Sequence, residues 1–315
     1  MNSSASYPAS LSFFFKACPD KDPLKAGSIG IGCTIDKKVT AIVSQNKQTQ
    51  VFFNGQPISF PTVLSVTTAL TDKPLLIKIK SDLPLGFGFG ISAASALSTT
   101  CAINKLLKLN KTNKELTEIS HVAEITNKTG LGSVATAVTG GFLLKTKPGL
   151  PVEATHFPFA GKKLYAVIVK GLATPKILKN AKRLSFINQA AGEALEKTKR
   201  RDNLTLADIL DLSLDFAKKS NLLENKAAAL LISKIKKAGG HATISMLGQV
   251  VISDRLVDSD KQYRKETLII TDRTNMSICH CEARRSTSRG NPCLAGRQVG
   301  RDCFAPLAMT SKYSQ

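Results

Sequence analysis

Tryptophan is absent from this 315-residue chain, and aromatic residues as a whole make up only 6% of it. Long apolar runs are absent as well: no stretch of about 18 apolar residues occurs, which excludes a membrane-spanning helix. The apolar residues 11–15 lack the preceding basic region and the following cleavage site of a signal peptide, so we interpret them as a strand. We therefore expect a cytoplasmic protein with no membrane partner.

The formal net charge is +21, which raises the question of a nucleic-acid partner. The lysines are scattered singly or in pairs, such as Lys37-Lys38 and Lys162-Lys163, and aromatic residues do not interleave with them. RNA-binding modules place aromatic stacking positions beside their basic residues. We therefore expect no nucleic-acid partner, and a solvated lysine-rich surface that speeds the capture of anionic ligands.

Four of the seven cysteines lie in the last 40 residues. A zinc site would explain this cluster, but Cys279 and Cys281 are too close for the usual knuckle and no second close pair follows. Residues 1–275 contain 32 lysines and 6 arginines, while residues 276–315 contain 1 lysine and 5 arginines. This switch indicates a change in base composition, and residues 279–310 resemble translated bacterial repeat DNA. We predict that residues 276–315 are a disordered read-through tail.

Strand signals dominate the first 60 residues. Residues 28–34 and 39–44 are short apolar stretches, which we expect to be two strands joined by a turn at Asp36-Lys37-Lys38. Asn54-Gly55 is typical of a hairpin turn, and residues 58–60 would form the second strand of that hairpin.

Helical and strand signals then alternate. Residues 75–80 alternate apolar and polar side chains, which predicts a half-buried strand. Apolar residues at helical spacing predict helices over 92–109 and 113–127. The second half predicts a strand, several helices and a closing strand, at about residues 164–169, 177–180, 185–198, 204–220, 225–237 and 249–253. The pattern indicates an α+β fold without internal repeats.

Residues 84–94 read PLGFGFGISAA, with three glycines at alternate positions. Because glycine has no Cβ, a polyanion can approach such a backbone closely, and the following helix offers free N–H groups and its positive dipole end. Ser92, at or near the helix N-cap, could direct its hydroxyl towards a magnesium ion. No Gly-Lys-Ser/Thr follows, so this is not the common phosphate loop. The loop alone leaves a tight structural turn open as the alternative.

The order Pro-x3-Gly-Phe-Gly-x-Ser-Ala-Ala resembles the second signature of the GHMP kinases, which binds ATP in galactokinase, homoserine kinase and mevalonate kinase. Phe89 stands for the usual leucine of that signature and Ile91 for its first serine. Ser92 matches the second serine, which helps to hold magnesium in the family.

Four further segments make the chain similar to the pantoate kinases of this superfamily. They follow one another in the family's order from residue 8 to residue 248, as PASLSFFF, DPLKAGSIGIG, HVAEITNKTGLGSVATAVTGGF and GHATISMLG. They resemble, in turn, Pro-Gly-His-Ile-Thr-x-Phe-Phe, Gly-Ser-x-Gly-x-Gly, His-x-Ala-Glu followed by Thr-Gly-Leu-Gly-Asp-Val, and the late Met-Leu-Gly signature.

The resemblance implies a two-domain GHMP kinase fold of the α+β class. A ribosomal-protein-like N-terminal domain that binds ATP would span residues 1–150, and an α/β C-terminal domain would span residues 151–275. The stretch 148–151, PGLP, is the best candidate for the linker between them. A homodimer is one expected state of such a protein.

The resemblance also implies roles for single residues. The ATP-binding residues would be Pro84, Gly86, Gly88, Gly90, Ser92 and Ala93. Ser92 and Glu124 would share Mg²⁺, although Glu124 could instead be a solvent-facing helix residue. The substrate, pantoate or a similar small hydroxy acid, would contact Gly27, Ser28, Thr129 and Gly130. The product would be 4-phosphopantoate, a precursor of coenzyme A, and His121 is given no catalytic role.

Ser133 occupies the catalytic position at which the family carries an aspartate, the usual candidate base. The loss leaves several functions open: an active pantoate kinase, a catalytically impaired binding relative, a GHMP kinase for another substrate such as mevalonate, or an RNA-binding protein with this fold. Phosphoryl transfer depends mostly on positioning and charge neutralisation, and homoserine kinases turn over without this base. We therefore expect an active ATP-dependent kinase.

Overall fold

The computed structural model describes residues 2–171, 174–178, 180–201, 203–256 and 263–272. All of them belong to the first of the two compact units into which the chain divides, Met1–Arg284. The tail predicted at residues 276–315, together with its cysteines and the zinc alternative, lies outside the described residues.

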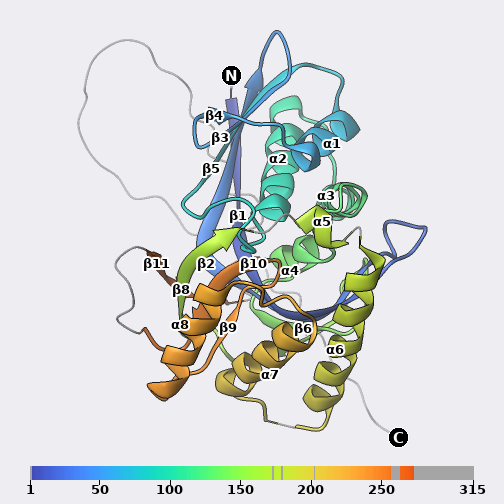
Figure 1. The fold of residues 1–315 in the computed structure, drawn as a ribbon. Coiled ribbons are helices and arrows are strands. Elements are labelled where there is room, and N and C mark those ends of the chain that lie inside the picture. Colours follow the sequence, from blue (N-terminus) through green and yellow to red (C-terminus); the bar gives the residue numbers. More distant parts are fainter. Residues whose placement is uncertain (1, 172–173, 179, 202, 257–262, 273–315) are drawn as a thin grey trace, which may run out of the picture. The chain divides into compact units, whose positions relative to one another are not determined.

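Within the described residues the strands form two sheets, the larger with seven strands (Figure 1). Its order is β4-β3-β5-β2-β6-β7, and β1 pairs along nearly the whole of β2. The strands are β1 (Asn2–Cys18), β2 (Gly27–Gln45), β3 (Gln50–Phe53), β4 (Gln56–Pro57), β5 (Leu75–Ser81), β6 (Phe142–Lys145) and β7 (Ala154–Phe157). Leu75, Ile77 and Ile79 are buried on β5, whereas Lys78 and Lys80 between them are exposed, as the alternation predicted.

Four helices accompany this sheet in the described residues: α1 (Pro61–Leu70), α2 (Ile91–Leu107), α3 (Asn113–Thr126) and α4 (Ser133–Thr139). Helix α2 packs on β1 and β2, and α1 and α3 pack against α2 (Figure 1). A capping box between Thr112 and Glu115 fixes the start of α3, since each side chain bonds the backbone N–H of the other. The helices predicted over 92–109 and 113–127 are confirmed as α2 and α3.

Two predictions for the N-terminal strands are wrong. The turn at Asp36-Lys37-Lys38 does not form, because β2 is one continuous strand from Gly27 to Gln45. It stays paired with β1 on both sides of a register shift near Pro8, and the Asp36 carboxylate accepts a hydrogen bond from the Ile269 backbone at 2.9 Å. The hairpin at Asn54-Gly55 exists, but its second strand is Gln56–Pro57 and not residues 58–60.

The smaller sheet, with order β11-β8-β10-β9, pairs all its neighbouring strands antiparallel. Its elements and the accompanying helices are β8 (Lys163–Gly171), α5 (Thr174–Leu178), α6 (Ala181–Lys199), α7 (Leu206–Lys219), α8 (Lys226–Lys237), β9 (Ala242–Ile244), β10 (Gly248–Ser253) and β11 (Arg264–Ile269). Strand β1 of the larger sheet also contacts two helices that accompany the smaller sheet, α6 and α7. Asn188 on α6 bonds both the N–H and the C=O of Ala17, at 2.8 and 3.0 Å, and the Ser213 hydroxyl on α7 donates to the Phe13 carbonyl at 2.5 Å.

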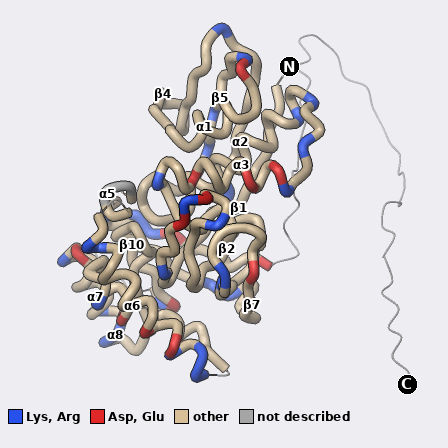
Figure 2. The backbone as a smooth tube through the Cα atoms, turned by 90° about the vertical axis from the view of Figure 1, so that its right-hand side faces the viewer, with Lys and Arg blue, Asp and Glu red and all other residues tan. Residues whose placement is uncertain are grey.

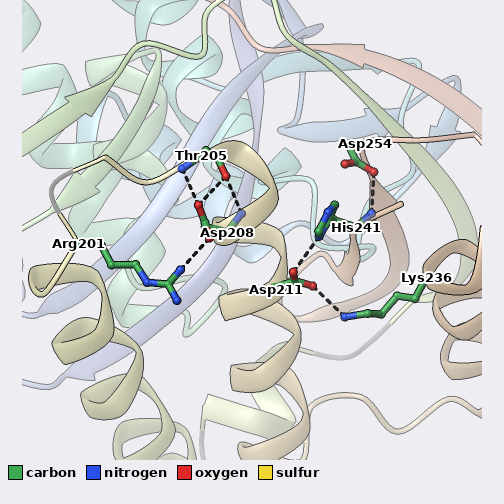
Figure 3. Close-up of polar contacts among 7 residues, drawn as sticks. All are labelled: Arg201, Thr205, Asp208, Asp211, Lys236, His241 and Asp254. Carbon is green, nitrogen blue, oxygen red and sulfur yellow. Dashed lines mark hydrogen bonds and ion pairs between the residues drawn. The ribbon is translucent and has the colours of Figure 1, made fainter. Parts of the chain in front are cut away.

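A polar cluster ties α7 to α8 and to the segment before β9 (Figure 3). Asp211 on α7 accepts hydrogen bonds from Lys236 on α8 at 2.9 Å and contacts Nδ1 of His241 at 2.8 Å. The backbone N–H of His241 donates to Asp254, just after β10, at 2.8 Å. These contacts brace the β9–β10 hairpin, whose turn carries the Met-Leu-Gly signature at residues 246–248.

The mixed helix and sheet content confirms the predicted α+β class. Lysine and arginine occur along many of the described elements and are not confined to one of them (Figure 2). In the described part of the chain, no helix combines the length and the apolar character that crossing a membrane requires.

Candidate active site

The glycine-rich loop joins β5 to the N-terminus of α2. Gly88 and Gly90 have φ angles of +81° and +64°, in the left-handed region that glycine adopts without strain. Gly90 is the N-cap of α2, and no side chain caps this helix. The first N–H groups of α2 therefore have no partner within the helix and no capping side chain, which is the arrangement that binds phosphate.

Two neighbours hold the loop in place. On one side the Ser10 backbone N–H on β1 donates to the Phe89 carbonyl at 2.9 Å. On the other side the Ser245 hydroxyl donates to the Gly88 carbonyl at 2.5 Å. A Cβ at Gly88 would lie 2.9 Å from the Met246 carbonyl oxygen and 3.0 Å from the Ser245 hydroxyl. The loop and the β9–β10 turn therefore fit together only because residue 88 has no side chain.

One cavity of about 290 Å³ adjoins this loop. Most of the residues predicted for the site line it: Gly86, Gly88, Gly90, Ser92, Ala93, Ser28, Thr129, Gly130, Ser133 and Glu124. Pro84 and Gly27 do not line it. Gly27 instead packs against the backbone of Gly149 and Leu131, where a Cβ would lie 2.5 Å from the Gly149 nitrogen.

Glu124 is a buried residue, with 1% of its surface exposed, so the solvent-facing alternative is wrong. Its Oε2 accepts a hydrogen bond from the Val134 backbone N–H at 3.2 Å, and Ser133 also bonds this carboxyl group. Burial raises the pKa of Glu124, while these hydrogen bonds and the charge of Lys145 act in the opposite direction. A divalent cation in the cavity would favour the ionised carboxylate for the same electrostatic reason.

Lys145 is a residue of this cavity that the sequence analysis missed. It ends β6, is 6% exposed, and its Nζ donates to the Gly132 carbonyl at 2.9 Å and to the Ser28 hydroxyl at 3.2 Å. Burial lowers its pKa from 10.5 to about 8, although the nearby Glu124 opposes the shift. A Cβ at Gly132 would overlap Nζ, so the absence of a side chain there makes room for the ammonium group.

His121 does not line the cavity. It lies against the chain just before Gly27 and Ser28, two of the predicted substrate contacts. It is 1% exposed, and its Nε2 contacts the Ala26 carbonyl oxygen at 3.0 Å. Nε2 must carry the proton in this contact, because a carbonyl can only accept. Burial lowers the pKa of His121, which favours this neutral, donating ring. The histidine therefore braces the chain immediately before Gly27 and Ser28.

Comparison with known proteins shows which class of protein this chain resembles. Residues 61–141 match the family described as GHMP kinases N terminal domain. Among solved structures, a phosphotransferase related to the CoA biosynthesis pathway is similar in fold, with a TM-score of 0.74 at 24% identity, over 86% of this chain and 96% of that chain. The chain is therefore similar to the GHMP kinases, in agreement with the sequence resemblance.

Within that class the chain is similar to pantoate kinases. The pantoate kinase of Methanocaldococcus jannaschii is 29% identical over 249 residues, which cover 78% of this chain and 89% of that relative. A mevalonate-3-kinase from Thermoplasma acidophilum, with mevalonate 3-phosphate and ADP bound, shares the fold more distantly. Its TM-score is 0.59 at 14% identity, over 86% of this chain and 96% of that chain.

Proposed function

We propose that the protein is an ATP-dependent kinase that phosphorylates pantoate to 4-phosphopantoate, a step towards coenzyme A. The similarity to pantoate kinases supports the choice of substrate. One observation carries the proposal: the glycine-rich loop at the N-terminus of α2 and the buried ammonium of Lys145 line the same cavity. The cavity thus offers two separate groups that attract anions, one for a triphosphate and one for a carboxylate.

The loop and the start of α2 are the proposed nucleotide site. Gly86 leaves the backbone open to a triphosphate, because the space within 4 Å of a Cβ there is empty. Gly88 and Gly90 instead let the loop pack closely against Met246 and Ser10, which fixes its shape. The uncapped N–H groups at the start of α2 would donate to the phosphate oxygens. ATP would supply the phosphoryl group, and magnesium would neutralise the charge of the triphosphate.

Ser92 and Glu124 are the proposed magnesium ligands, and the chemistry of their donors fits the ion. Magnesium prefers oxygen ligands and is commonly held by one or two carboxylates together with substrate phosphates and water. Both side chains line the cavity next to the loop. The described residues contain no group of three or more His, Cys, Asp and Glu side chains placed for a metal ion, so the nucleotide phosphates would complete the coordination.

Lys145, Ser28, Thr129 and Gly130 are the proposed substrate contacts. Among the described residues the Lys145 ammonium donates to two oxygen acceptors, which leaves one of its three N–H groups available. A carboxylate beside it would gain a charge-assisted hydrogen bond in a site with little water. The hydroxyl to be phosphorylated would then lie towards the loop.

Ser133 would not act as a base, because its hydroxyl is far less basic than the aspartate that the family resemblance implies for this position. Its side chain and backbone instead bond Glu124, which holds the proposed magnesium ligand in place. The hydroxyl oxygen of the substrate would form a bond to the γ-phosphorus as the bond to ADP breaks, and its proton would leave to solvent or to a phosphate oxygen. Catalysis would then depend on positioning and charge.

A kinase acting on mevalonate or a similar hydroxy acid is the second candidate, because the fold is also that of a mevalonate-3-kinase. The division into domains at residue 150, the homodimer, the cytoplasmic location and the absence of a nucleic-acid partner stay predictions from the sequence.

A coupled assay of ADP release over pantoate, mevalonate, homoserine and galactose, with and without magnesium, tests the proposal. We expect magnesium-dependent turnover with pantoate and little with the other three. Turnover that prefers mevalonate would favour the second candidate, and no turnover with any substrate would favour an impaired binding protein.

The affinity for pantoate is expected to fall at alkaline pH. The carboxylate of the substrate is ionised throughout, so binding requires the protonated form of Lys145, whose pKa is about 8. As the pH rises through this value the ammonium is lost, and KM for pantoate should rise by about tenfold for each further pH unit. Bound pantoate raises the pKa of Lys145, so kcat should change less. Profiles of KM from pH 6.5 to 9.5 check this, and a flat profile would contradict it.

A further inference from the structure

Thr62 is a buried residue behind the cavity. It is the second residue of α1, is 0% exposed, and does not belong to the lining of the cavity. Its hydroxyl lies between two side chains that do line it. The Ser92 hydroxyl contacts Thr62 Oγ1 at 3.2 Å, and the Thr129 hydroxyl contacts it at 2.9 Å. Thr62 thus connects a proposed magnesium ligand with a proposed substrate contact.

The hydroxyl chain ends at a backbone carbonyl. Thr129 Oγ1 donates to the carbonyl oxygen of Glu124 over 3.5 Å, and the Thr129 backbone N–H donates to the same oxygen at 3.2 Å. The chain therefore runs from Ser92 through Thr62 and Thr129 to the C-terminal end of α3, where the carboxylate of Glu124 also lies.

The Ser92 hydroxyl is the donor in its contact with Thr62. Each hydroxyl has a single proton to donate, so the proton that Ser92 gives to Thr62 is not available elsewhere. The proton of Ser92 then points away from the cavity, and its lone pairs stay available to a cation.

We propose that Thr62 is a positioning residue that orients the Ser92 hydroxyl as a magnesium ligand. The inference rests on the proposed function, since it requires a magnesium–nucleotide complex in the cavity. Without the Thr62 hydroxyl, Ser92 can rotate and direct its proton towards the cation, which removes a ligand. Because Thr62 does not line the cavity, its side chain would touch neither the metal nor the substrate.

Isothermal titration with a non-hydrolysable ATP analogue, with magnesium and in EDTA, tests the proposal without relying on turnover. Thr62→Val keeps the shape of the side chain and removes its hydroxyl. We expect it to weaken binding by about tenfold in magnesium, the effect of one lost hydrogen bond, and to leave binding in EDTA unchanged. Thr62→Ser keeps the hydroxyl and should bind as the wild type does.

Thr67→Val is the matched control. Thr67 is also buried on α1, but its hydroxyl bonds only the Val63 carbonyl of its own helix, at 2.7 Å, so the substitution should not affect nucleotide binding. If Thr62→Val does not fold, Thr62→Ala carries the same test with a smaller side chain.

Three results would overturn the inference: wild-type affinity in magnesium for the variants without the hydroxyl, an equal loss in EDTA, or an equal loss in Thr67→Val. A wild-type protein that binds no magnesium–nucleotide complex would refute the proposed function itself, and the role of Thr62 with it.

Discussion

Replacing Lys145 by methionine is expected to lower kcat/KM for pantoate by about 10²–10³-fold. Methionine has a similar length but no charge, so the substrate carboxylate would lose its buried ammonium partner. A hydrogen bond to a charged group contributes about 1.5–3 kcal/mol, and an anion left without its partner in a buried site adds to this loss. Nucleotide affinity should change little, because the loop and α2 are untouched. Steady-state kinetics and titration with an ATP analogue measure the two effects.

Lys147→Met is the matched control for Lys145→Met. Lys147 lies two residues further along, its side chain is half exposed, and it pairs with Glu153 at 3.0 Å outside the cavity. This variant should retain the wild-type kcat/KM. An unchanged kcat/KM in a folded Lys145→Met protein would contradict the proposed substrate site, and a selective loss of nucleotide affinity would place Lys145 beside the triphosphate instead.

Gly88→Val is expected to abolish nucleotide binding. Its side chain would crowd the Met246 carbonyl and the Ser245 hydroxyl, and would displace the loop from the position in which its backbone can bind the phosphates. The positive φ angle of 81° adds strain for a β-branched residue. Calorimetric titration with magnesium and an ATP analogue measures the loss.

Gly161→Val separates the steric effect from the backbone strain. Gly161 has nearly the same φ angle, +78°, and no atom lies within 4 Å of its Cβ position. Both variants should lose about 1–3 kcal/mol of stability to backbone strain, and Gly88→Val should lose more because of its clash with the β9–β10 turn; only Gly88→Val should lose the nucleotide. Wild-type affinity in a folded Gly88→Val protein would remove the loop from the nucleotide site.

The helices that surround the cavity could be predicted because their signals are local. Helix α2 follows a glycine-rich loop and carries small and apolar residues at helical spacing, and α3 begins with a capping box. Helix α1 was missed. Its sequence, PTVLSVTTAL, is rich in β-branched residues with low helix propensity, and its packing against α2 and α3 outweighs that preference.

The error in β2 has a similar physical cause. Three charged residues in succession indicate a turn in an isolated segment. Here β2 continues through these three residues, because β1 pairs with it both before and after them. Asp36 also has its own hydrogen-bond partner on β11. Pairing with a distant strand decides such cases, and a local pattern does not contain it.

The cavity was predicted only in part. The glycine-rich loop, Ser92 and Glu124 were found through motifs, which record spacing along the chain. Lys145 was hidden among 33 lysines, and no spacing distinguishes it from the solvated ones. Its proposed role depends on burial at the end of β6 and on the space that Gly132 leaves for its ammonium group, and only the fold brings these together. Thr62 was missed for the same reason, since its two partners are 30 and 67 residues away.

Phosphorus NMR of the protein incubated with magnesium, ATP and pantoate tests most directly whether the protein transfers a phosphoryl group from ATP to pantoate. We expect a new phosphate monoester resonance that grows in step with ADP and requires both magnesium and pantoate. ADP formed together with inorganic phosphate alone, or no consumption of ATP in the presence of pantoate, would contradict it.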